Sequence, residues 1–340
     1  MHTDRRRAVA TAAALTLALA APLAQAAPDW KPDRPVTIVV PFPPGGTADQ
    51  VARLVGAEME KHFGQRFVVT NQPGATGAIG ARAVRDAPKD GYTWLGTAHR
   101  LVGTYSIMSD VKITLDEFHQ FLAITNVPVI SVGNASPFAD FAAVLAALKA
   151  QPGQVSVGTA GPATSGHFAM EAIAQTVGVK YRHVTYQGGA PAVLSTVTGE
   201  TAVNAELASD QAEMIRAKRL RPLAALSPTP LNVTGFGTIP SITQWIPNLP
   251  AVTTQFGILI PKGVPANVIE TIDKLWKEKF ATLPALKTWA DERGALLTVL
   301  SGQAAQDAVW PTVQASAWMM HGAGLTKASP ETIGIAPIKK

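Results

Sequence analysis

Residues 35–64 read P-V-T-I-V-V-P-F-P-P-G-G-T-A-D-Q-V-A-R-L-V-G-A-E-M-E-K-H-F-G, a pattern that predicts one strand, one loop and one helix. The nearly continuous β-branched run at residues 36–40 is typical of a strand covered on both faces in a parallel sheet. Prolines follow it and cannot donate to a sheet, so the strand ends there. Apolar residues then recur at helical spacing, and a T-x-x-Q capping box begins at Thr47. We therefore expect a helix over residues 48–63.

The loop at residues 42–47 lies between the carboxyl end of this strand and the amino end of the helix. Ligands bind at this position in open parallel sheets. Gly45 and Gly46 leave backbone N–H groups accessible, and a helix start carries partial positive charge, so the loop favours an anion. The loop matches neither G-x-G-x-x-G nor G-x-x-x-x-G-K-[ST], which argues against dinucleotide and ATP sites. A capped helix after a proline turn, without a ligand, is the alternative interpretation.

The first 26 residues are typical of a secretory signal peptide. Three arginines at residues 5–7 precede an Ala/Leu/Thr run, and Ala24-Gln25-Ala26 fits an A-x-A cleavage site. The apolar run is shorter than the ~20 residues that a spanning helix needs. We expect cleavage near Ala26 and a periplasmic product, exported by general secretion rather than by the twin-arginine route.

The amino-acid composition excludes several kinds of chemistry and several kinds of binding partner. The chain has 340 residues, no cysteine and 47% hydrophobic residues, so stability must come from apolar cores rather than from disulfides, and thiolate chemistry is excluded. Without Asp4 and the three arginines of the signal peptide the formal net charge falls from +5 to +3, and the remaining chain has no basic run, so we expect no nucleic-acid partner. The length suits two moderate domains.

The order of strand, glycine-bearing loop and helix recurs along the chain. After residues 35–64 it returns with the loop at 71–80, and a third strand ends at residues 97–100. A second group follows, with loops at 158–167 and 186–191 after short apolar strands. This repetition predicts two α/β units whose loops gather at sheet edges.

Six motifs in this order together resemble a known family, the extracytoplasmic solute receptors of tripartite tricarboxylate transporters, or Bug family. The motifs are P-F-P-P-G-G-T-A-D, N-Q-P-G-A-T-G-A-I-G, D-G-Y-T-W-L-G-T, T-A-G-P-A-T-S-G-H, H-V-T-Y-Q-G-G-A-P-A and L-R-P-L-A. The likeness extends from about residue 35 to residue 265.

The resemblance implies a periplasmic binding protein fold of type II-like, Venus-flytrap form, with two doubly wound α/β lobes joined by a two-crossing hinge. The first lobe would comprise residues 27–129 and 253–340, and the second residues 130–252. The hinge would lie near residues 126–132 and 252–257. It also implies a monomer that traps a small organic mono- or dicarboxylate, aliphatic or aromatic, and then docks on a multi-spanning membrane permease.

Carried over position by position, the resemblance implies ligand-binding residues in both lobes. They are Phe42, Gly46, Thr47, Asp49, Thr97, Ala98, Thr159, Ala160, Ser165, His167, Tyr186, Gly188, Gly189 and Ala190.

Two further candidates, Arg100 and Glu206, are positions where the chain departs from the family's usual residues. The family usually has small polar residues where His99 and Arg100 stand, Asp where Ala202 stands, and Asp or another small polar residue where Glu206 stands. Arg100 is interpreted either as a bidentate carboxylate anchor or as a solvated surface group. Glu206 in a cleft would repel a carboxylate unless it accepts from an amine, a hydroxyl or a protonated acid, and the alternative is a salt bridge within the lobe. His167 either donates to the ligand or caps its own loop.

Two other functional classes were weighed. A hydrolase needs an activated nucleophile, but G-x-S-x-G and H-E-x-x-H are absent from the sequence, and neither the histidines nor the acidic residues have metal-ligand spacing. We therefore expect no enzyme, no catalytic residues, no metal and no cofactor. A periplasmic sensor that presents the same carboxylate to a signalling membrane protein remains the main alternative to a transport receptor.

Overall fold

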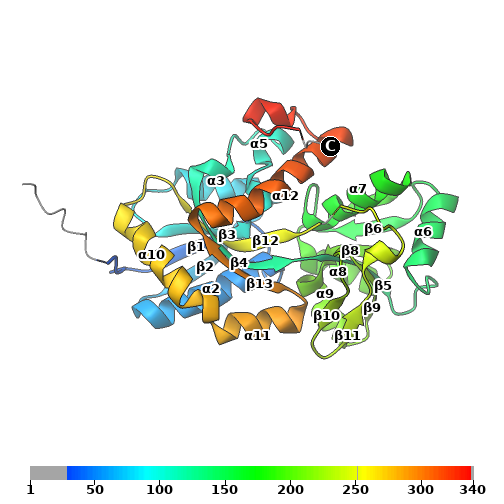
Figure 1. Ribbon diagram of the computed structural model, residues 1–340, viewed down its shortest axis with the longest axis horizontal. Helices are drawn as coiled ribbons and strands as arrows, with labels where there is room; N and C mark the ends of the chain where they lie inside the picture. Colours follow the sequence, from blue (N-terminus) through cyan, green and yellow to red (C-terminus); the bar gives the residue numbers. More distant parts are fainter. Residues whose placement is uncertain (1–28, 251, 338–340) are drawn as a thin grey trace, which may run out of the picture.

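The computed structural model describes residues 29–250 and 252–337 and contains two separate sheets, each covered by helices (Figure 1). We call the part built on the six-stranded sheet the first lobe and the part built on the five-stranded sheet the second lobe. The two lobes lie side by side along the long axis of the molecule. The expected signal peptide and its cleavage site lie outside the described residues.

The first lobe contains a mixed sheet rather than a purely parallel one. Strand β1 pairs in parallel with β2 and β3, whereas β12 runs antiparallel to both β3 and β4, and β13 runs antiparallel to β4. The antiparallel part arises because the chain leaves this lobe along β4 and re-enters it along β12. The strand order is β13(Leu296–Ser301), β4(Phe118–Asn126), β12(Thr254–Pro261), β3(Thr93–Ala98), β1(Val36–Val40), β2(Phe67–Asn71).

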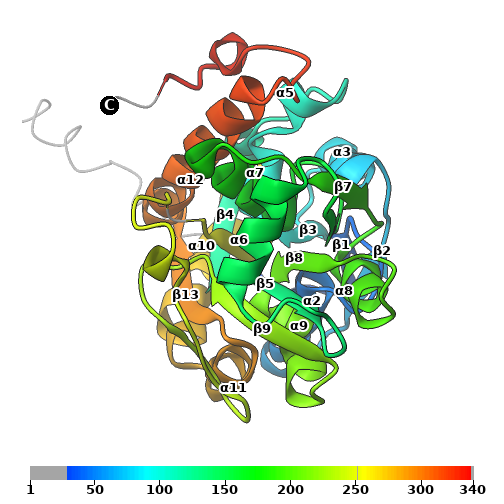
Figure 2. The same ribbon diagram turned by 90° about the vertical axis from the view of Figure 1, so that its right-hand side faces the viewer.

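Helices cover both faces of this sheet (Figures 1 and 2). Helix α12 runs along the edge of the first lobe toward the second and contacts α7(Ser165–Val177). The α-helices of the first lobe are α2(Thr47–Phe63), α3(Ala78–Asp86), α4(His99–Val102), α5(Tyr105–Met108), α10(Ala266–Glu278), α11(Pro284–Arg293) and α12(Gly302–Gly322).

The second lobe repeats the arrangement on a smaller scale. Strand β6 pairs in parallel with β7 and β8, while β5 pairs antiparallel with β8 and β9. The order is β7(Arg182–Thr185), β6(Ser156–Thr159), β8(Val203–Leu207), β5(Pro128–Gly133), β9(Leu220–Ala225), and a hairpin is formed by β10(Leu231–Val233) and β11(Gly237–Ile239). Besides α7, its helices are α6(Phe141–Ala150), α8(Gly189–Val197) and α9(Ala208–Arg216).

The chain passes between the lobes at two neighbouring places. Strand β4 of the first sheet ends at Asn126, and β5 of the second sheet begins only two residues later. On the return, β12 begins at Thr254, which pairs with Asn126. The expected two-lobe α/β binding-protein fold with two crossings is therefore confirmed. The lobe boundaries at 129/130 and 252/253 remain a proposal that is compatible with these strands.

Each lobe has an apolar core, as the composition requires. In the first lobe the β1 run is buried on both faces, with Val36, Ile38 and Val40 fully enclosed. Trp94 on the neighbouring strand is also fully buried, and its indole N–H donates to the carbonyl of Gly91 at 2.7 Å. Burial of this kind, at about 25 cal/mol per Å² of apolar surface, holds each sheet against its helices.

The capping box expected at the start of α2 is wrong. The helix begins at Thr47, with Gly46 as its N-cap and no side-chain cap within the helix. The amide of Gln50 donates instead to the carbonyl of Gly45 at 2.7 Å. The hydroxyl of Thr47 contacts Ser209 and Asp210 of the second lobe. A local motif cannot predict this result, because the competing acceptors come from residues more than 160 positions away.

Within residues 29–250 and 252–337, the search for a helix with the length and hydropathy of a membrane span finds none.

Candidate functional site

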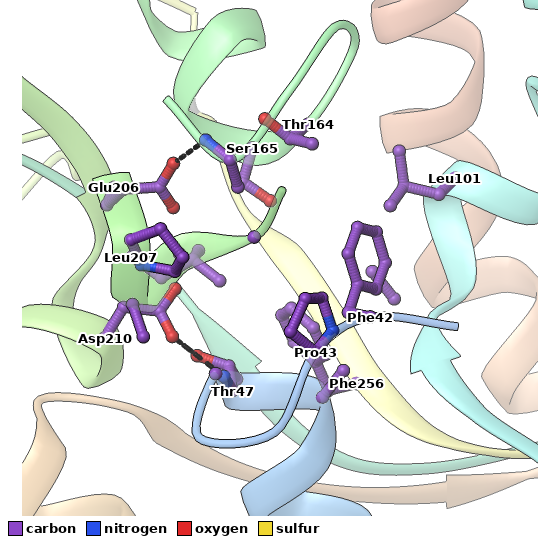
Figure 3. A pocket seen from close by; sticks show the side chains of 18 of the residues that line it. Phe42, Pro43, Thr47, Leu101, Thr164, Ser165, Glu206, Leu207, Asp210 and Phe256 are labelled. Carbon is purple, nitrogen blue, oxygen red and sulfur yellow. Dashed lines mark hydrogen bonds between the residues drawn. The ribbon is translucent and has the colours of Figure 1, made fainter. Parts of the chain in front are cut away.

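A cavity lies between the two lobes (Figure 3). Its walls come from the loop before α2, the end of β3, the starts of α7 and α8, and the end of β8. The lining residues are Phe42, Pro43, Pro44, Gly46, Thr47, Ala48, Ala98, Leu101, Ala160, Thr164, Ser165, Gly188, Gly189, Ala190, Pro191, Glu206, Leu207, Asp210 and Phe256. We call this space the inner cavity.

Three of the helices that begin at the inner cavity follow glycine-bearing loops. The α2 start follows Gly46, the α7 start follows Thr164, and the α8 start follows Gly188, whose φ of 113° requires a glycine. The first N–H groups of a helix lack intrahelical acceptors and carry partial positive charge, so each start favours an acceptor or anion. The sequence places glycines or small residues at these starts, which lets a ligand approach the backbone.

A second, more polar cavity adjoins the first, and we call it the outer cavity. Phe42, Pro43, Ala160 and Gly188 line both cavities. The lining of the outer cavity contains no charged side chain and includes the loops at residues 73–77 and 185–188. The cleft between the lobes therefore contains two adjoining cavities of different character.

Asp210 joins the second lobe to the start of α2 in the first. Its Oδ1 accepts from both the backbone N–H and the hydroxyl of Thr47, each at 2.8 Å (Figure 3). Its Oδ2 would lie only 2.5 Å from a Cβ atom added to Gly189, so the same carboxylate packs closely against the start of α8. Asp210 thus stands between two of the three helix starts, where a ligand anion could otherwise lie.

Glu206 brings a second carboxylate to the cavity from the end of β8. The side chain is 1% exposed, and its Oε1 accepts from the backbone N–H of Ala160 in the loop before α7. Burial raises the pKa of Glu206 well above its ordinary value, and the neighbouring Asp210 charge raises it further. No ion pair involving Glu206 is found among the described residues, which disfavours the salt bridge weighed from the sequence.

The pKa of Asp210 is also raised, to about 6, chiefly by burial. The hydrogen bonds from Thr47 and the positive charge of Arg293 act in the opposite direction. Arg293 belongs to α11 and does not line the inner cavity. The charged side chains that line the cavity are therefore two acidic ones.

Ten of the residues expected to bind the ligand line the inner cavity. They are Phe42, Gly46, Thr47, Ala98, Ala160, Ser165, Gly188, Gly189, Ala190 and Glu206. They come from five separate loops or strand ends, so the predicted motifs do meet in space. Tyr186 lines the outer cavity instead.

Asp49 and Thr97 lie behind the cavity wall. Asp49 accepts from the backbone N–H of Gly45 at 3.0 Å and from the amide of Asn71 at 2.9 Å, and so fixes the loop before α2. Thr97 is buried in β3, and its hydroxyl has no hydrogen-bond partner among the described residues. Neither side chain lines the inner or the outer cavity.

Arg100 is fully buried and lines neither cavity, so it is not the solvated surface group weighed from the sequence. Its guanidinium donates to the hydroxyl of Ser316 at 2.6 Å and to the carbonyl of Ala163 at 3.1 Å, and it lies over the ring of Phe168 at 5.1 Å. Burial lowers the pKa of Arg100 to about 10. Arg100 therefore connects α4 and α12 of the first lobe to the second-lobe loop before α7.

His167 and Thr159 support the second-lobe loop from behind. The Nδ1 of His167 accepts from the backbone N–H of Ala163 at 3.0 Å, which is the loop-capping role weighed from the sequence. Its ring stacks on His183 with centroids 4.0 Å apart, and the Nε2 of His183 contacts the hydroxyl of Thr159 at 2.6 Å. Burial lowers the pKa of His183 to about 4.

Sequence reasoning missed nine lining residues, of which Asp210 matters most for charge. The others are Pro43, Pro44, Ala48, Leu101, Thr164, Pro191, Leu207 and Phe256. A usable signal existed for Asp210, because it lies in the first turn of the helix that follows the strand carrying Glu206. The apolar wall formed by Leu101 and Phe256 has no local signal, since both read as ordinary core residues.

The arrangement can hold a small molecule through backbone N–H groups, hydroxyls, two carboxyl groups and apolar contacts. Among the described residues, no cluster of three or more His, Cys, Asp or Glu side chains could hold a metal ion.

Comparison with known proteins places the chain among solute receptors. A sequence model of the family described as "Tripartite tricarboxylate transporter family receptor" matches residues 51–318. A protein of Pseudomonas sp. (strain P51), named "UPF0065 protein in tcbD-tcbE intergenic region", is 36% identical over 272 residues, covering 79% of this chain and 80% of its own. "Protein BugT" of Bordetella pertussis (strain Tohama I) is 30% identical over 295 residues, covering 85% and 89%.

The fold is also similar to solved structures. The R. palustris protein Rpa4515, described "with adipate", superposes with a TM-score of 0.78 at 25% identity, over 87% of this chain and 99% of that one.

Proposed function

This chain belongs to the tripartite tricarboxylate transporter receptor family, and on that premise we propose that it captures a small organic carboxylate between its lobes and delivers it to a membrane permease. The family and the fold are those of solute-binding receptors rather than enzymes. The similar R. palustris protein was solved with adipate, which supports a carboxylate ligand. The signal-peptide pattern at residues 1–26 supports a periplasmic location.

The observation that carries this proposal is the convergence of three helix starts on one cavity between the lobes. A carboxylate placed there would accept hydrogen bonds from backbone N–H groups of both lobes. No hydrogen bond among the described residues uses the N–H groups of Gly189 and Ala190 at the start of α8, so these donors are available. Contacts made by both lobes exist together only when the cleft is closed, so a ligand there favours closure.

The experiment is a thermal unfolding panel on the mature protein, refolded to remove carried-over ligand. Aliphatic dicarboxylates including adipate, hydroxy acids, amino acids and aromatic carboxylates are each added in excess. A ligand at a hundred times its Kd stabilises the fold by ~2.7 kcal/mol, which raises the Tm by several degrees. Absence of any shift across the whole panel would contradict the proposal.

The position of the site is tested by replacing each of two exposed alanines with tryptophan. Ala190 is exposed at the cavity rim on α8, whereas Ala150 is exposed at the end of α6, away from both cavities. We expect Ala190→Trp to fill the cavity and weaken the carboxylate found in the panel at least tenfold in calorimetry. Ala150→Trp, the matched control, should retain wild-type affinity. Equal affinities in the two variants would show that the ligand does not bind in the inner cavity.

A further inference from the structure

The inner cavity is lined by two acidic side chains, Glu206 at the end of β8 and Asp210 in the first turn of α9, which is an unusual lining for a space offered to an anion. Glu206 accepts from Ala160, and Asp210 accepts from Thr47 across the cleft. The lining contains no lysine, arginine or histidine. Two of the backbone donors that would otherwise attract a ligand carboxylate are therefore already used by carboxyl groups of the protein itself.

If the ligand is a dicarboxylate, the carboxylate that enters the inner cavity lies close to the carboxyl groups of Glu206 and Asp210. The two carboxyl groups share at least one negative charge near neutral pH, and a further anion close to that charge in a poorly solvated site is repelled strongly, because the low dielectric weakens screening. An ammonium or N–H group in the same place would instead complete the hydrogen bonding of both carboxyl groups. The outer cavity differs, since no acidic side chain lines it.

The two cavities thus define a direction for the bound molecule. Phe42 and Pro43 line both, so a small chain-like molecule can extend from one into the other past apolar contacts. Leu207 and Phe256 provide further apolar surface in the inner part. The end of the ligand in the inner cavity contacts the carboxyl groups of Glu206 and Asp210. The end that extends toward the outer cavity contacts backbone groups and uncharged side chains.

We infer that the ligand is a nitrogen-bearing carboxylate, bound with its ammonium or N–H end against Glu206 and Asp210 and its carboxylate at the start of α8, on the side where Gly188 also lines the outer cavity. This inference rests on the proposed function and narrows it: plain dicarboxylates, in which the inward end is a second anion, are the poorer ligands. Glu206 and Asp210 are the residues that set this preference.

The test compares compounds that differ only at one end. The pairs are succinate with 4-aminobutanoate, glutarate with 5-aminopentanoate, adipate with 6-aminohexanoate, and isophthalate with 3-aminobenzoate, each titrated by calorimetry. We expect at least one nitrogen-bearing member to bind tenfold or more tightly than its dicarboxylate partner. In Glu206→Gln and Asp210→Asn that ratio should fall by tenfold or more, while the exposed, distant Glu278→Gln keeps it.

The outcomes separate this inference from the function on which it rests. If dicarboxylates bind as well as or better than their nitrogen-bearing partners, the inference is overturned and the carboxylate receptor stands. If the preference persists in both folded variants, the acidic pair does not cause it and the inference is likewise overturned. If no carboxylate of either series or of the wider panel binds, the proposed function fails and the inference fails with it. Asp210, which is only partly buried, provides a testable variant even if Glu206→Gln does not fold.

Discussion

Two glycine pairs in this molecule look alike in sequence and differ in what they can bind. Gly45-Gly46 precedes α2 in the first lobe, and Gly188-Gly189 leads into α8 in the second. Both follow a strand and open a helix, so both predict an anion site. In the structure, the first N–H of α2 donates to Asp210, whereas no hydrogen bond among the described residues uses the N–H groups of Gly189 and Ala190.

The difference comes from the opposite lobe rather than from the loops themselves. Asp210 reaches across the cleft to Thr47 and at the same time lies against Gly189, so one side chain touches both helix starts. Its geometry satisfies one start and leaves the other with unused donors. A helix start therefore defines where an acceptor is favoured, and the partner lobe decides whether that acceptor is a ligand or a residue of the protein.

The largest expected difference between the two loops follows from replacing a glycine in each. A Cβ at Gly189 would lie 2.5 Å from Asp210 Oδ2, whereas a Cβ at Gly46 would lie 3.7 Å from Asp210 Oδ1, an ordinary contact. We expect Gly189→Val to displace the carboxylate, obstruct closure and weaken ligand binding by more than about a hundredfold, which corresponds to about 2.7 kcal/mol. Gly46→Ala should change affinity by less than about fivefold, or about 1 kcal/mol.

Calorimetry with the ligand found in the panel measures both affinities, and circular dichroism checks that each variant is folded. Similar losses in the two variants would show that the loops tolerate side chains equally and would contradict the asymmetry around Asp210. Wild-type affinity in Gly189→Val would show that the start of α8 is not part of the binding site.

The next effect concerns the bond between the lobes. Asp210→Ala removes the acceptor of two hydrogen bonds from Thr47, and a hydrogen bond to a charged group is worth about 1.5–3 kcal/mol. We expect the ratio of open to closed molecules in the ligand-free protein to rise about tenfold or more. X-ray scattering would show this change as a larger radius of gyration. Asp210→Asn keeps an acceptor oxygen and should shift the equilibrium less. A radius unchanged from wild type in Asp210→Ala would show that this bond does not hold the lobes together.

The sequence predicted the fold well because its signals are local. The β-branched run at residues 36–40 is buried as expected, and α2 ends at Phe63 before Gly64, whose φ is 69°. The order of strands and loops also predicts that loops gather at the edge of each sheet, whereas the meeting of the Gly46, Ala160 and Gly189 loops at one cleft was implied by the family resemblance. The strand, the helix end and the loops at the sheet edges depend on neighbours in the chain, which a sequence displays directly.

The features that the sequence missed depend on distant partners. Thr47 reads as a helix cap because of Gln50, yet its hydroxyl bonds to Asp210. Arg100 reads as exposed or ligand-binding, yet it is enclosed by Ser316 and Ala163. In each case the partner lies more than 60 residues away. Burial and pairing of polar groups are therefore the part of this site that local patterns do not encode.

The smallest predicted effect is a difference between Asp49 and Asp210 in how each changes stability with pH. Asp49 and Asp210 both lie at the start of α2, but Asp49 has a lowered pKa, because hydrogen bonds and the charge of Arg53 outweigh its burial, whereas burial raises the pKa of Asp210 to about 6. A lowered folded-state pKa contributes stability above the ordinary value that is lost as the pH falls below about 4. A raised one costs stability progressively as the pH rises from about 4 to 6.

Unfolding by urea between pH 3 and pH 7 should therefore separate the two carboxylates. In Asp210→Asn the free energy of unfolding should fall less than in wild type between pH 4 and pH 6, by on the order of 1 kcal/mol, in part because Glu206 also loses a neighbouring charge. In Asp49→Asn the difference should appear on the acid side instead, as a shallower loss of stability below pH 4. Identical pH profiles for both variants would mean that Asp49 of α2 and Asp210 of α9 sense the same electrostatic environment, which the position of Asp210 in the opposite lobe argues against.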